Sequence, residues 1–501
     1  MNVKLVTATL IIMINVQSIC IGQSPQFGMF EGHGDVGQPA LPGSSSYNKL
    51  TQEYTLQGAG VNMWGSTDQF HFLWKKIKGD FIISATIRFV GNGRHDHRKI
   101  GIMAREKLTP DSRYADACVH GDELSSLQFR TSDGAQTEQV AVSSYHPTDI
   151  ELQRTGNTFT FSAAVFGENY KSVTKDLSLP DEIFAGLFIC SHDETIVENA
   201  VFSNVRVIIP APATFVPYRD YIGSHLEIMD VFSGRRKILH TAPNSLQAPN
   251  WTNDGKHLIY NSEGLLYTYQ LSDGKISQLN TGFAKQNNND HVLSFDGKRI
   301  AISNHVGEKR VSTLFVLPIT GSDKPIQITS VDSGHSYLHG WSPDGRKLIF
   351  TGHRNNRYDI YTIDIATKKE IALTNTPSLD DGPEYTPDGR YIYFNSVRTG
   401  TMKIWRMKPD GSQQEQVTFD EYNDWFPHIS PDNKWIVYLS FPKDINPSDH
   451  PFYKKVYIKL MPSAGGVPRT IGYVYGGQGS INVPSWSPDS RWVGFVSNSG
   501  Q

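Results

Sequence analysis

Apolar and polar residues alternate along several short segments of the first half of the chain. The alternation is clearest in GDFIISATIRFVG (79–91) and NTFTFSAAVFG (157–167), and KIGIMARE (99–106) and SSLQFRTSD (125–133) look similar. A period of two residues is typical of β-strands, whose successive side chains point to opposite faces of a sheet. Helical periodicity is almost absent from this half. We therefore predict that residues 24–209 form a strand-rich domain of two packed sheets.

A strand–turn–strand pattern recurs six times in the second half of the chain. In each copy a residue that is usually aromatic precedes a turn containing aspartate, and an apolar run follows the turn. The copies are WTNDGKHLIY (251–260), LSFDGKRIAI (293–302), WSPDGRKLIF (341–350), YTPDGRYIYF (385–394), ISPDNKWIVY (429–438) and WSPDSRWVGF (486–495). Their aspartates, at positions 254, 296, 344, 388, 432 and 489, are 42 to 57 residues apart. This spacing is close to the length of a β-propeller blade.

Each copy is predicted to be the inner half of a four-stranded unit. The Asp-Gly pair suits a tight hairpin turn, because glycine adopts the positive backbone dihedrals that such turns need. Two outer strands follow around another turn, as in DIYTIDIATKKEIALT (359–374). The sixth copy has only two strands, and SHLEIMDVFSGRRKILHT (224–241) supplies the missing outer pair. We therefore predict six blades, the last of which joins the two ends of the repeat region and removes exposed sheet edges.

The repeated WSPDG-(K/R)-x-I-x-F pattern, followed by D-I-Y-x-(I/M)-(D/N), resembles the TolB-type propeller repeat over residues 218–501. Similar repeats occur in the propellers of prolyl-oligopeptidase-like peptidases and of oligogalacturonate lyases. The strands of the first half, which close with VFSNVRV (201–207), resemble concanavalin A-like and laminin-G-like jelly rolls of exported carbohydrate-active proteins. The resemblance implies an all-β protein. Its parts are an N-terminal jelly-roll sandwich (24–209), a proline-rich linker (210–217) and a six-bladed β-propeller (218–501).

The first 22 residues are predicted to be a secretory signal peptide. One lysine precedes an apolar stretch from Leu5 to Val16, which is too short to span a bilayer, and small residues then suit cleavage after Gly22. Acylation of Cys20 is less favoured, because Ile19 before it is bulky. We predict an exported protein, periplasmic or extracellular, with no transmembrane segment in the mature chain.

Composition and motif searches exclude several functions. A net charge of −3 offers no basic surplus, which argues against nucleic acid as a partner. The G-x-S-x-G pentapeptide of serine hydrolases is absent, so peptidase chemistry of that kind is excluded. GHGDVG (32–37) matches the dinucleotide-binding pattern without a preceding strand or a following helix, and we interpret it as a loop. Cys118 and Cys190 remain after cleavage, and their spacing leaves both a disulfide and two free thiols open.

The candidate site lies just before the inner strands, where the blades converge on the mouth of a central channel. Two residues before the end of these strands, four units have proline, whereas the other two have His291 and His339. Candidate ligand-binding residues around the mouth are Gln247, Asn289, Asp290, Tyr337, Asp380, Asp424, Trp425 and Asn482. Candidate catalytic residues are His291, His339, Asp381, Glu384 and His428.

This mixture of imidazoles, carboxylates and aromatic rings supports several alternatives. Such residues bind divalent metals such as Mn, Ca or Zn, or supply an acid and a base for cleaving a sugar chain. They also bind sugars without chemistry, with Tyr337 and Trp425 stacking on the apolar face of the ring. The remaining alternative has no ligand: the channel mouth is polar only because it is exposed to water. Oligogalacturonate lyases use a histidine-rich metal site in the channel, and the resemblance implies His291, His339 and His428 as the metal ligands here.

Two functional hypotheses follow from these observations. The first is a binding module for an oligosaccharide or a protein ligand. The alternative is a carbohydrate-active enzyme, either an oligogalacturonate-lyase-like polysaccharide lyase or a glycoside hydrolase. The insertion FPKDINPSDHPFYKK (441–455), which contains His450 and Tyr453, is predicted to be a long loop of the kind that lids a channel.

Overall fold

Strands account for nearly all regular structure in the computed structural model, which describes residues 26–500. The exception among these residues is a single turn of 3-10 helix, η1 (Val331–Ser333). No helix in the described part is long and apolar enough to cross a membrane. The predicted signal peptide (1–22), including Cys20, lies outside the described residues.

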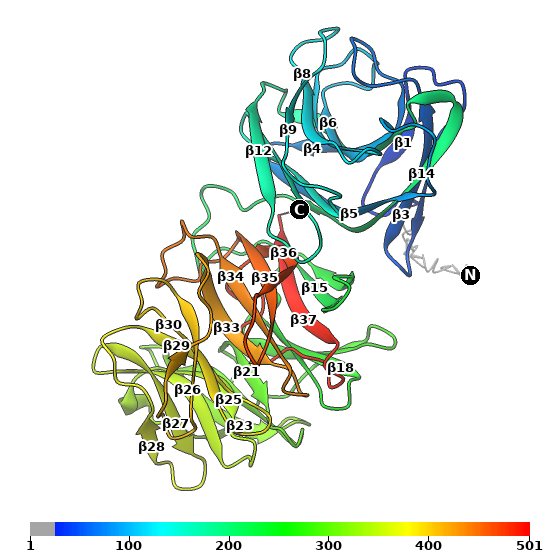
Figure 1. The fold of residues 1–501 in the computed structure, drawn as a ribbon. Helices are drawn as coiled ribbons and strands as arrows, with labels where there is room; N and C mark the ends of the chain where they lie inside the picture. The colour runs from blue at the N-terminus through cyan, green and yellow to red at the C-terminus, as the bar shows by residue number, and fades with distance from the viewer. Residues whose placement is uncertain (1–25, 501) are drawn as a thin grey trace, which may run out of the picture.

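Two seven-stranded antiparallel sheets form the first half of the described chain (Figure 1). In hydrogen-bonding order, the first sheet consists of β1 (Gly32–Val36), β4 (Phe70–Lys78), β13 (Glu182–Cys190), β6 (Lys99–Arg105), β7 (Tyr114–His120), β8 (Ser125–Arg130) and β9 (Glu138–Ala141). The second sheet consists of β12 (Lys171–Asp176), β11 (Thr158–Ala164), β10 (Asp149–Thr155), β5 (Phe81–Val90), β14 (Asp193–Ile208), β3 (Glu53–Gly60) and β2 (Ser44–Asn48).

One hydrophobic core fills the space between these two sheets. Ile83 on β5 and Phe202 on β14 belong to the same buried cluster as Leu73 on β4 and Ile102 on β6. All four side chains are fully buried. Burial of a side chain of this size stabilises the folded state by about 1.5–3 kcal/mol. The alternating apolar positions of the sequence therefore hold the two sheets face to face.

The structure corrects one motif interpretation and decides another. GHGDVG is not a loop, because Gly32–Val36 forms edge strand β1, in which Gly32 lies opposite Trp74 of β4. The loop interpretation was wrong because these glycines leave room for an aromatic neighbour. A Cβ atom at Gly32 would lie only 3.2 Å from the Trp74 ring. Cys118 and Cys190 are both buried and free, so the two-thiol alternative is the one observed.

Five four-stranded antiparallel sheets, blades I to V, make up most of the second half of the chain. Blade I is β17 (Gln247–Trp251), β18 (His257–Ser262), β19 (Leu265–Gln270) and β20 (Ile276–Gln278). Blade II is β21 (Asn287–Leu293), β22 (Arg299–Val306), β23 (Val311–Pro318) and β24 (Ile326–Gln327). Blade III is β25 (Ser336–Trp341), β26 (Lys347–Arg354), β27 (Arg357–Asp364) and β28 (Glu370–Ala372). Blade IV is β29 (Asp380–Tyr385), β30 (Ile392–Ser396), β31 (Lys403–Met407) and β32 (Glu415–Gln416). Blade V is β33 (Asn423–Ile429), β34 (Trp435–Phe441), β35 (Lys454–Pro462) and β36 (Arg469–Gly476).

Blade VI joins the two ends of the repeat region, as predicted. Its strands are β16 (Arg236–Ala242), β15 (Gly223–Asp230) and β37 (Trp492–Ser499), in that order. An isolated bridge between Trp486 and Val493 adds the innermost segment. Figure 1 shows β37, in red, beside β15, in green, and the two strands pair along their whole length. The prediction of an all-β chain with a six-bladed propeller is confirmed.

The aspartate of each repeat holds the turn that ends the inner strand. In the copy at 341–350, Ser342 Oγ donates a hydrogen bond of 2.6 Å to Asp344 Oδ1, and the Arg346 N–H donates to the same oxygen. Gly345 takes the left-handed conformation (φ 67°), which favours glycine. The same serine- or threonine-to-aspartate bond, at 2.5–2.6 Å, recurs in Thr252–Asp254, Ser294–Asp296, Thr386–Asp388, Ser430–Asp432 and Ser487–Asp489.

A buried ionic network ties the two-sheet half to the propeller. Glu227 on β15 is fully buried and accepts hydrogen bonds from Arg206 on β14 and from Arg236 on β16. Ser497 on β37 also donates to this carboxylate. Burying a carboxylate is costly unless it is paired and hydrogen-bonded, and here two guanidinium groups compensate it. The two halves therefore meet at a specific, fully paired contact.

Candidate functional site

The inner strands of the six blades surround a central channel that has two different ends. We call the end at which these strands begin the start end, and the end at which they reach the Ser/Thr-x-Asp turn the turn end. A strand advances about 3.3 Å per residue, and the partners of Asp381 and Glu384 on β30, Asn395 and Tyr393, are two residues apart, so Asp381 and Glu384 on β29 lie about 7 Å apart along the channel. The sequence-predicted residues are therefore divided between the two ends.

An ion pair joins blades III and IV at the start end. His339 Nε2 lies 3.3 Å from Asp381 Oδ1, and the two side chains are 6% and 14% exposed. Burial alone would raise the pKa of Asp381, but the hydrogen bond and charge of His339 outweigh it and lower this pKa to about 2. The same pairing outweighs the burial of His339 and raises the pKa of its imidazole. Thr351 Oγ1 also donates to Asp381 at 2.6 Å. The structure thus brings these two predicted residues together.

Asp290 of blade II is the third titratable group at this end. Its carboxylate is buried and accepts one hydrogen bond of 2.8 Å from Asn288 Nδ2. Burial raises the pKa of Asp290 to about 7, with a lowering effect from His339 and a raising effect from Asp381. Asp290 therefore gains and loses its proton near neutral pH, and the charges of His339 and Asp381 influence this equilibrium.

The structure does not support a metal site at His291, His339 and His428. The ring nitrogens of His291 face two backbone carbonyls, Asn289 O at 3.1 Å and Ile259 O at 3.2 Å. Burial lowers the pKa of His291 to about 4, so this ring is a neutral structural donor. Within residues 26–500, no group of three or more His, Cys, Asp or Glu side chains could hold a metal ion. The three rings have separate partners instead: His291 faces backbone carbonyls, His339 pairs with Asp381, and His428 pairs with Glu384.

His428 pairs with Glu384 instead of facing a ligand. Its Nδ1 lies 2.6 Å from Glu384 Oε2, and its Nε2 lies 2.8 Å from the carbonyl oxygen of Ile481. Both ring nitrogens therefore face acceptors within the protein, and the ring is not turned toward a ligand.

Several predicted ligand-binding residues are structural in this fold. Trp425 is completely buried and belongs to a hydrophobic core, so its ring is not available for stacking on a sugar. Asp380 is buried, and Nη2 of Arg398 donates to both of its carboxylate oxygens at 2.9 Å. Asp424 accepts a hydrogen bond from Ser440 and lies 3.6 Å from Lys403 Nζ. Ion pairs thus engage Asp380 and Asp424, and the hydrophobic core encloses Trp425, which the sequence position alone did not reveal.

The remaining predicted residues do lie at the start end. Asn482 is buried and bonds Gln478 and the Gly479 N–H, and Gln247 bonds Ser245. Asn289 Nδ2 is buried without a hydrogen-bond partner. Tyr337 is partly buried, and burial together with the nearby Tyr358, Asp290 and Asp381 raises the pKa of its hydroxyl.

The 441–455 insertion reaches the channel through His450. The His450 ring lies 4.5 Å from the Trp425 ring and 5.3 Å from the Phe426 ring, measured between centroids. Burial lowers the pKa of His450, with an opposing effect from Asp381. The loop therefore covers part of the start end, close to the His339–Asp381 pair.

The turn end holds a pocket of about 300 Å³. All six blades contribute to it, and most of the contributing side chains are apolar or aromatic. They include Trp251, Phe295, Trp341, Pro387, Pro431, Trp486 and Pro488. The tryptophans and prolines of the repeat thus both build the blades and line the pocket. Sequence reasoning placed the site at the other end of the channel, although the recurrence of tryptophan and proline beside every turn was a signal for this one.

Polar groups in the turn-end pocket are few. Glu384 lines the pocket and is paired with His428, as described above. Trp341 and Trp486 use their indole N–H groups to bond backbone oxygens, those of Val292 and His428. Two buried atoms of the lining have no hydrogen-bond partner, Trp251 Nε1 and Asn250 Oδ1. Both atoms are fully enclosed by protein, so the surface that the pocket presents is mainly apolar.

Comparison with known proteins places the propeller among TolB-related chains. The family model described as "TolB beta propeller domain" matches residues 308–447. Uncharacterized protein Atu1656 of Agrobacterium fabrum is 43% identical over 274 residues, which cover 54% of this chain and 92% of that protein. The solved structure of a TolB candidate from Agrobacterium tumefaciens is 42% identical, with a TM-score of 0.53, and covers 56% of this chain and 100% of that one.

More distant relatives share a smaller part. A Tol-Pal system protein TolB of Francisella tularensis subsp. tularensis is 26% identical over 179 residues, which are 34% of this chain. The match spans 40% of that relative's length.

Proposed function

Because the chain belongs to the family of TolB-like β-propeller proteins, we propose that it is a binding module for an apolar segment of a partner protein, held in the turn-end pocket. The observation that carries the proposal is the lining of this pocket, which combines tryptophan, proline and phenylalanine side chains from all six blades. Ligand sites are typically concave and mostly apolar, with a few placed polar groups, and 300 Å³ reaches the lower end of their usual size.

The lining of the pocket favours an apolar ligand surface. Glu384 is its one carboxylate, and His428 Nδ1 lies 2.6 Å from Glu384 Oε2, so this oxygen is already engaged within the protein. A sugar would need several hydroxyl partners, whereas most of the lining is apolar. Apolar side chains of a peptide bury themselves here at a gain of about 25 cal/mol per Å² of apolar surface.

A selection experiment tests this proposal on the intact chain. A phage-displayed peptide library is selected against the protein, and enriched peptides are measured by fluorescence anisotropy. We expect peptides with adjacent aromatic, aliphatic or proline residues and saturable binding. In parallel, acidic and neutral oligosaccharides are tested for binding and for unsaturated products. Failure to enrich any saturable peptide, or binding or cleavage of an oligosaccharide instead, would overturn the proposal.

The first half and the targeting of the chain are further proposals. We propose that residues 24–209 are a concanavalin A-like sandwich domain, joined by the linker 210–217 to the propeller (218–501). The two sheets and their shared core support it. We also propose export to the periplasm or the cell exterior after cleavage behind Gly22. Mass spectrometry of the protein from its native host is expected to find Gln23 as the first residue, and a retained N-terminus would contradict export by this signal.

A further inference from the structure

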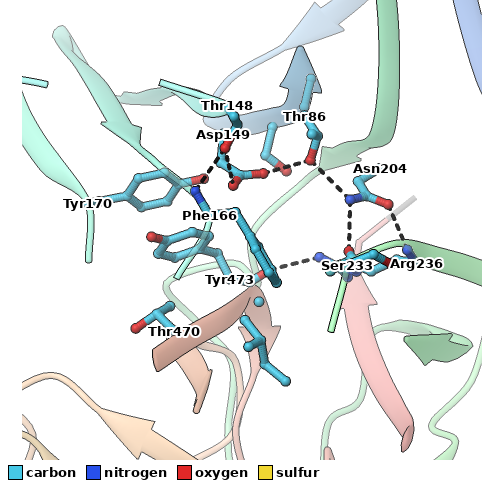
Figure 2. Close-up of a pocket in the computed structure, with 15 residues that line it drawn as sticks. Thr86, Thr148, Asp149, Phe166, Tyr170, Asn204, Ser233, Arg236, Thr470 and Tyr473 are labelled. Carbon is cyan, nitrogen blue, oxygen red and sulfur yellow. Dashed lines mark hydrogen bonds between the residues drawn. The ribbon is translucent and has the colours of Figure 1, made fainter. Parts of the chain in front are cut away.

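A second cavity lies between the second sheet of the first half and the outer strands of blades V and VI. Its volume is about 190 Å³. Figure 2 shows its walls: Thr86, Thr148, Asp149 and Asn204 come from the first half, whereas Arg236, Thr470 and Tyr473 come from the propeller. Ligand pockets occur preferentially at such interfaces between structural units. This cavity is separate from the propeller channel, since it shares no lining residue with the turn-end pocket.

A chain of hydrogen bonds in the cavity wall ends at Asp149. Asn204 Nδ2 donates to Thr86 Oγ1 at 3.0 Å, and Thr86 Oγ1 donates to Asp149 Oδ1 at 2.6 Å. Thr148 Oγ1 donates to the other carboxylate oxygen at 3.2 Å. A carboxylate accepts about four hydrogen bonds, so Asp149 keeps unused acceptor capacity at the cavity. The wall therefore orients this carboxylate without saturating it.

Asp149 has no ion-pair partner among the described residues. The nearest guanidinium in the wall, that of Arg236, is already committed, because it bonds Glu227 at 2.7 and 3.1 Å and the carbonyl oxygen of Tyr473 at 2.9 Å. Burial raises the pKa of Asp149, and its threonine partners and Arg236 oppose this. A buried carboxylate without an ion-pair partner lowers the stability of the folded protein unless a cation binds beside it.

Three aromatic residues also line the cavity. Tyr170 and Tyr473 stack across the interface, with ring centroids 3.5 Å apart and planes 15° apart. Phe166 lies beside them and packs against Gly234, where a Cβ atom would approach the Phe166 ring to 2.3 Å. Aromatic faces attract organic cations through the ring quadrupole. A carboxylate beside three aromatic rings is thus the chemistry that recognises an ammonium group.

We propose that this cavity binds a small organic ammonium compound, whose positive charge pairs with Asp149 and whose carbon skeleton contacts Phe166, Tyr170 and Tyr473. A cavity of about 150 Å³ holds a benzene molecule, so the available 190 Å³ suits a compound of about six to eight non-hydrogen atoms. The ligand touches both halves of the protein, and its binding therefore also strengthens their contact.

Isothermal titration of the full chain with choline, ethanolamine and putrescine at pH 8 tests the proposal. Methyl glucoside and acetate serve as neutral and anionic controls of similar size. We expect saturable binding of at least one ammonium probe and weaker or absent binding of both controls. Absence of binding for all three ammonium probes at about 10 mM, or equal binding of methyl glucoside, overturns the proposal.

Matched variants locate the binding. Asp149→Asn keeps the shape of the side chain and is expected to weaken binding of the ammonium probe at least tenfold. Asp176→Asn on β12, which removes a carboxylate bonded to Thr158 outside the cavity, is expected to change binding less than twofold. Phe166→Leu is expected to weaken binding at least threefold with the charge intact. Unchanged binding of the ammonium probe by Asp149→Asn contradicts the assignment. Phe295→Ala changes the turn-end pocket and is expected to leave ammonium binding unchanged, so it separates this proposal from the peptide site.

Discussion

His339 Nε2 lies 3.3 Å from Asp381 Oδ1, so a buried ion pair bridges blades III and IV inside the channel. Replacing His339 by alanine leaves the Asp381 carboxylate buried without its cation. Removing one partner of a buried pair costs about 3–5 kcal/mol. We expect His339→Ala to lower the free energy of unfolding by this amount in urea denaturation. His146→Ala, which removes an exposed histidine paired with Glu123, is the control and is expected to change stability little. A loss below about 1 kcal/mol for His339→Ala would show that the pair is unimportant.

Asp290 makes stability depend on pH in the opposite sense to most carboxylates. Its folded-state pKa of about 7 lies above the ordinary value of 3.8, so the folded protein holds this proton more tightly. The buried, ionised carboxylate of Asp290 therefore destabilises the folded protein fully above about pH 7, and this effect is absent below about pH 4. A difference of about three pKa units corresponds to about 4 kcal/mol. We expect Asp290→Asn to raise the unfolding temperature at pH 8 and to leave it nearly unchanged at pH 4. Equal effects at both pH values would contradict the raised pKa.

Glu227 is expected to control whether the two halves of the protein unfold together. Burial alone would raise the pKa of Glu227, but Arg206 and Arg236 outweigh it and hold this pKa well below its usual range. Its stabilising contribution is therefore present above about pH 4.5 and is lost as the pH falls toward the folded-state pKa. Glu227→Ala leaves two guanidinium groups buried without an anion.

Calorimetry provides the measurement for Glu227. The wild-type chain is expected to unfold in one transition at pH 7, and Glu227→Ala is expected to split it or to lower stability by about 3–5 kcal/mol. The control is Glu53→Gln, which breaks a more exposed pair with Arg235, 3.6 Å apart, across the same boundary. A single unshifted transition in Glu227→Ala would contradict the role of the network.

The blades were predictable because each turn carries its own local chemistry. The Ser342–Asp344 bond and the left-handed Gly345 form within five residues, so their sequence pattern reports the turn directly. The closing of blade VI was predictable for a similar reason, since the strand that Trp492 begins needed a partner and residues 224–241 supplied one.

The site was harder to predict because it depends on which way side chains turn between neighbouring blades. Trp425 occupies the same repeat position as Tyr337, yet it is completely buried, whereas Tyr337 keeps some exposure. His291 and His428 look like ligands in the sequence, but backbone carbonyls and Glu384 occupy their nitrogens. The cavity at Asp149 had no sequence signal, because its walls come from segments separated by more than 300 residues.

The peptide-binding proposal depends most directly on Phe295, a pocket-lining ring that is 39% exposed. Phe419 offers a matched control, since it is 75% exposed and does not line the pocket. The decisive measurement is the dissociation constant of a selected apolar peptide for Phe295→Ala and Phe419→Ala, by fluorescence anisotropy. We predict at least a tenfold loss, about 1.4 kcal/mol, for Phe295→Ala and less than a twofold change for Phe419→Ala. Equal affinities of the two variants would contradict binding in the turn-end pocket.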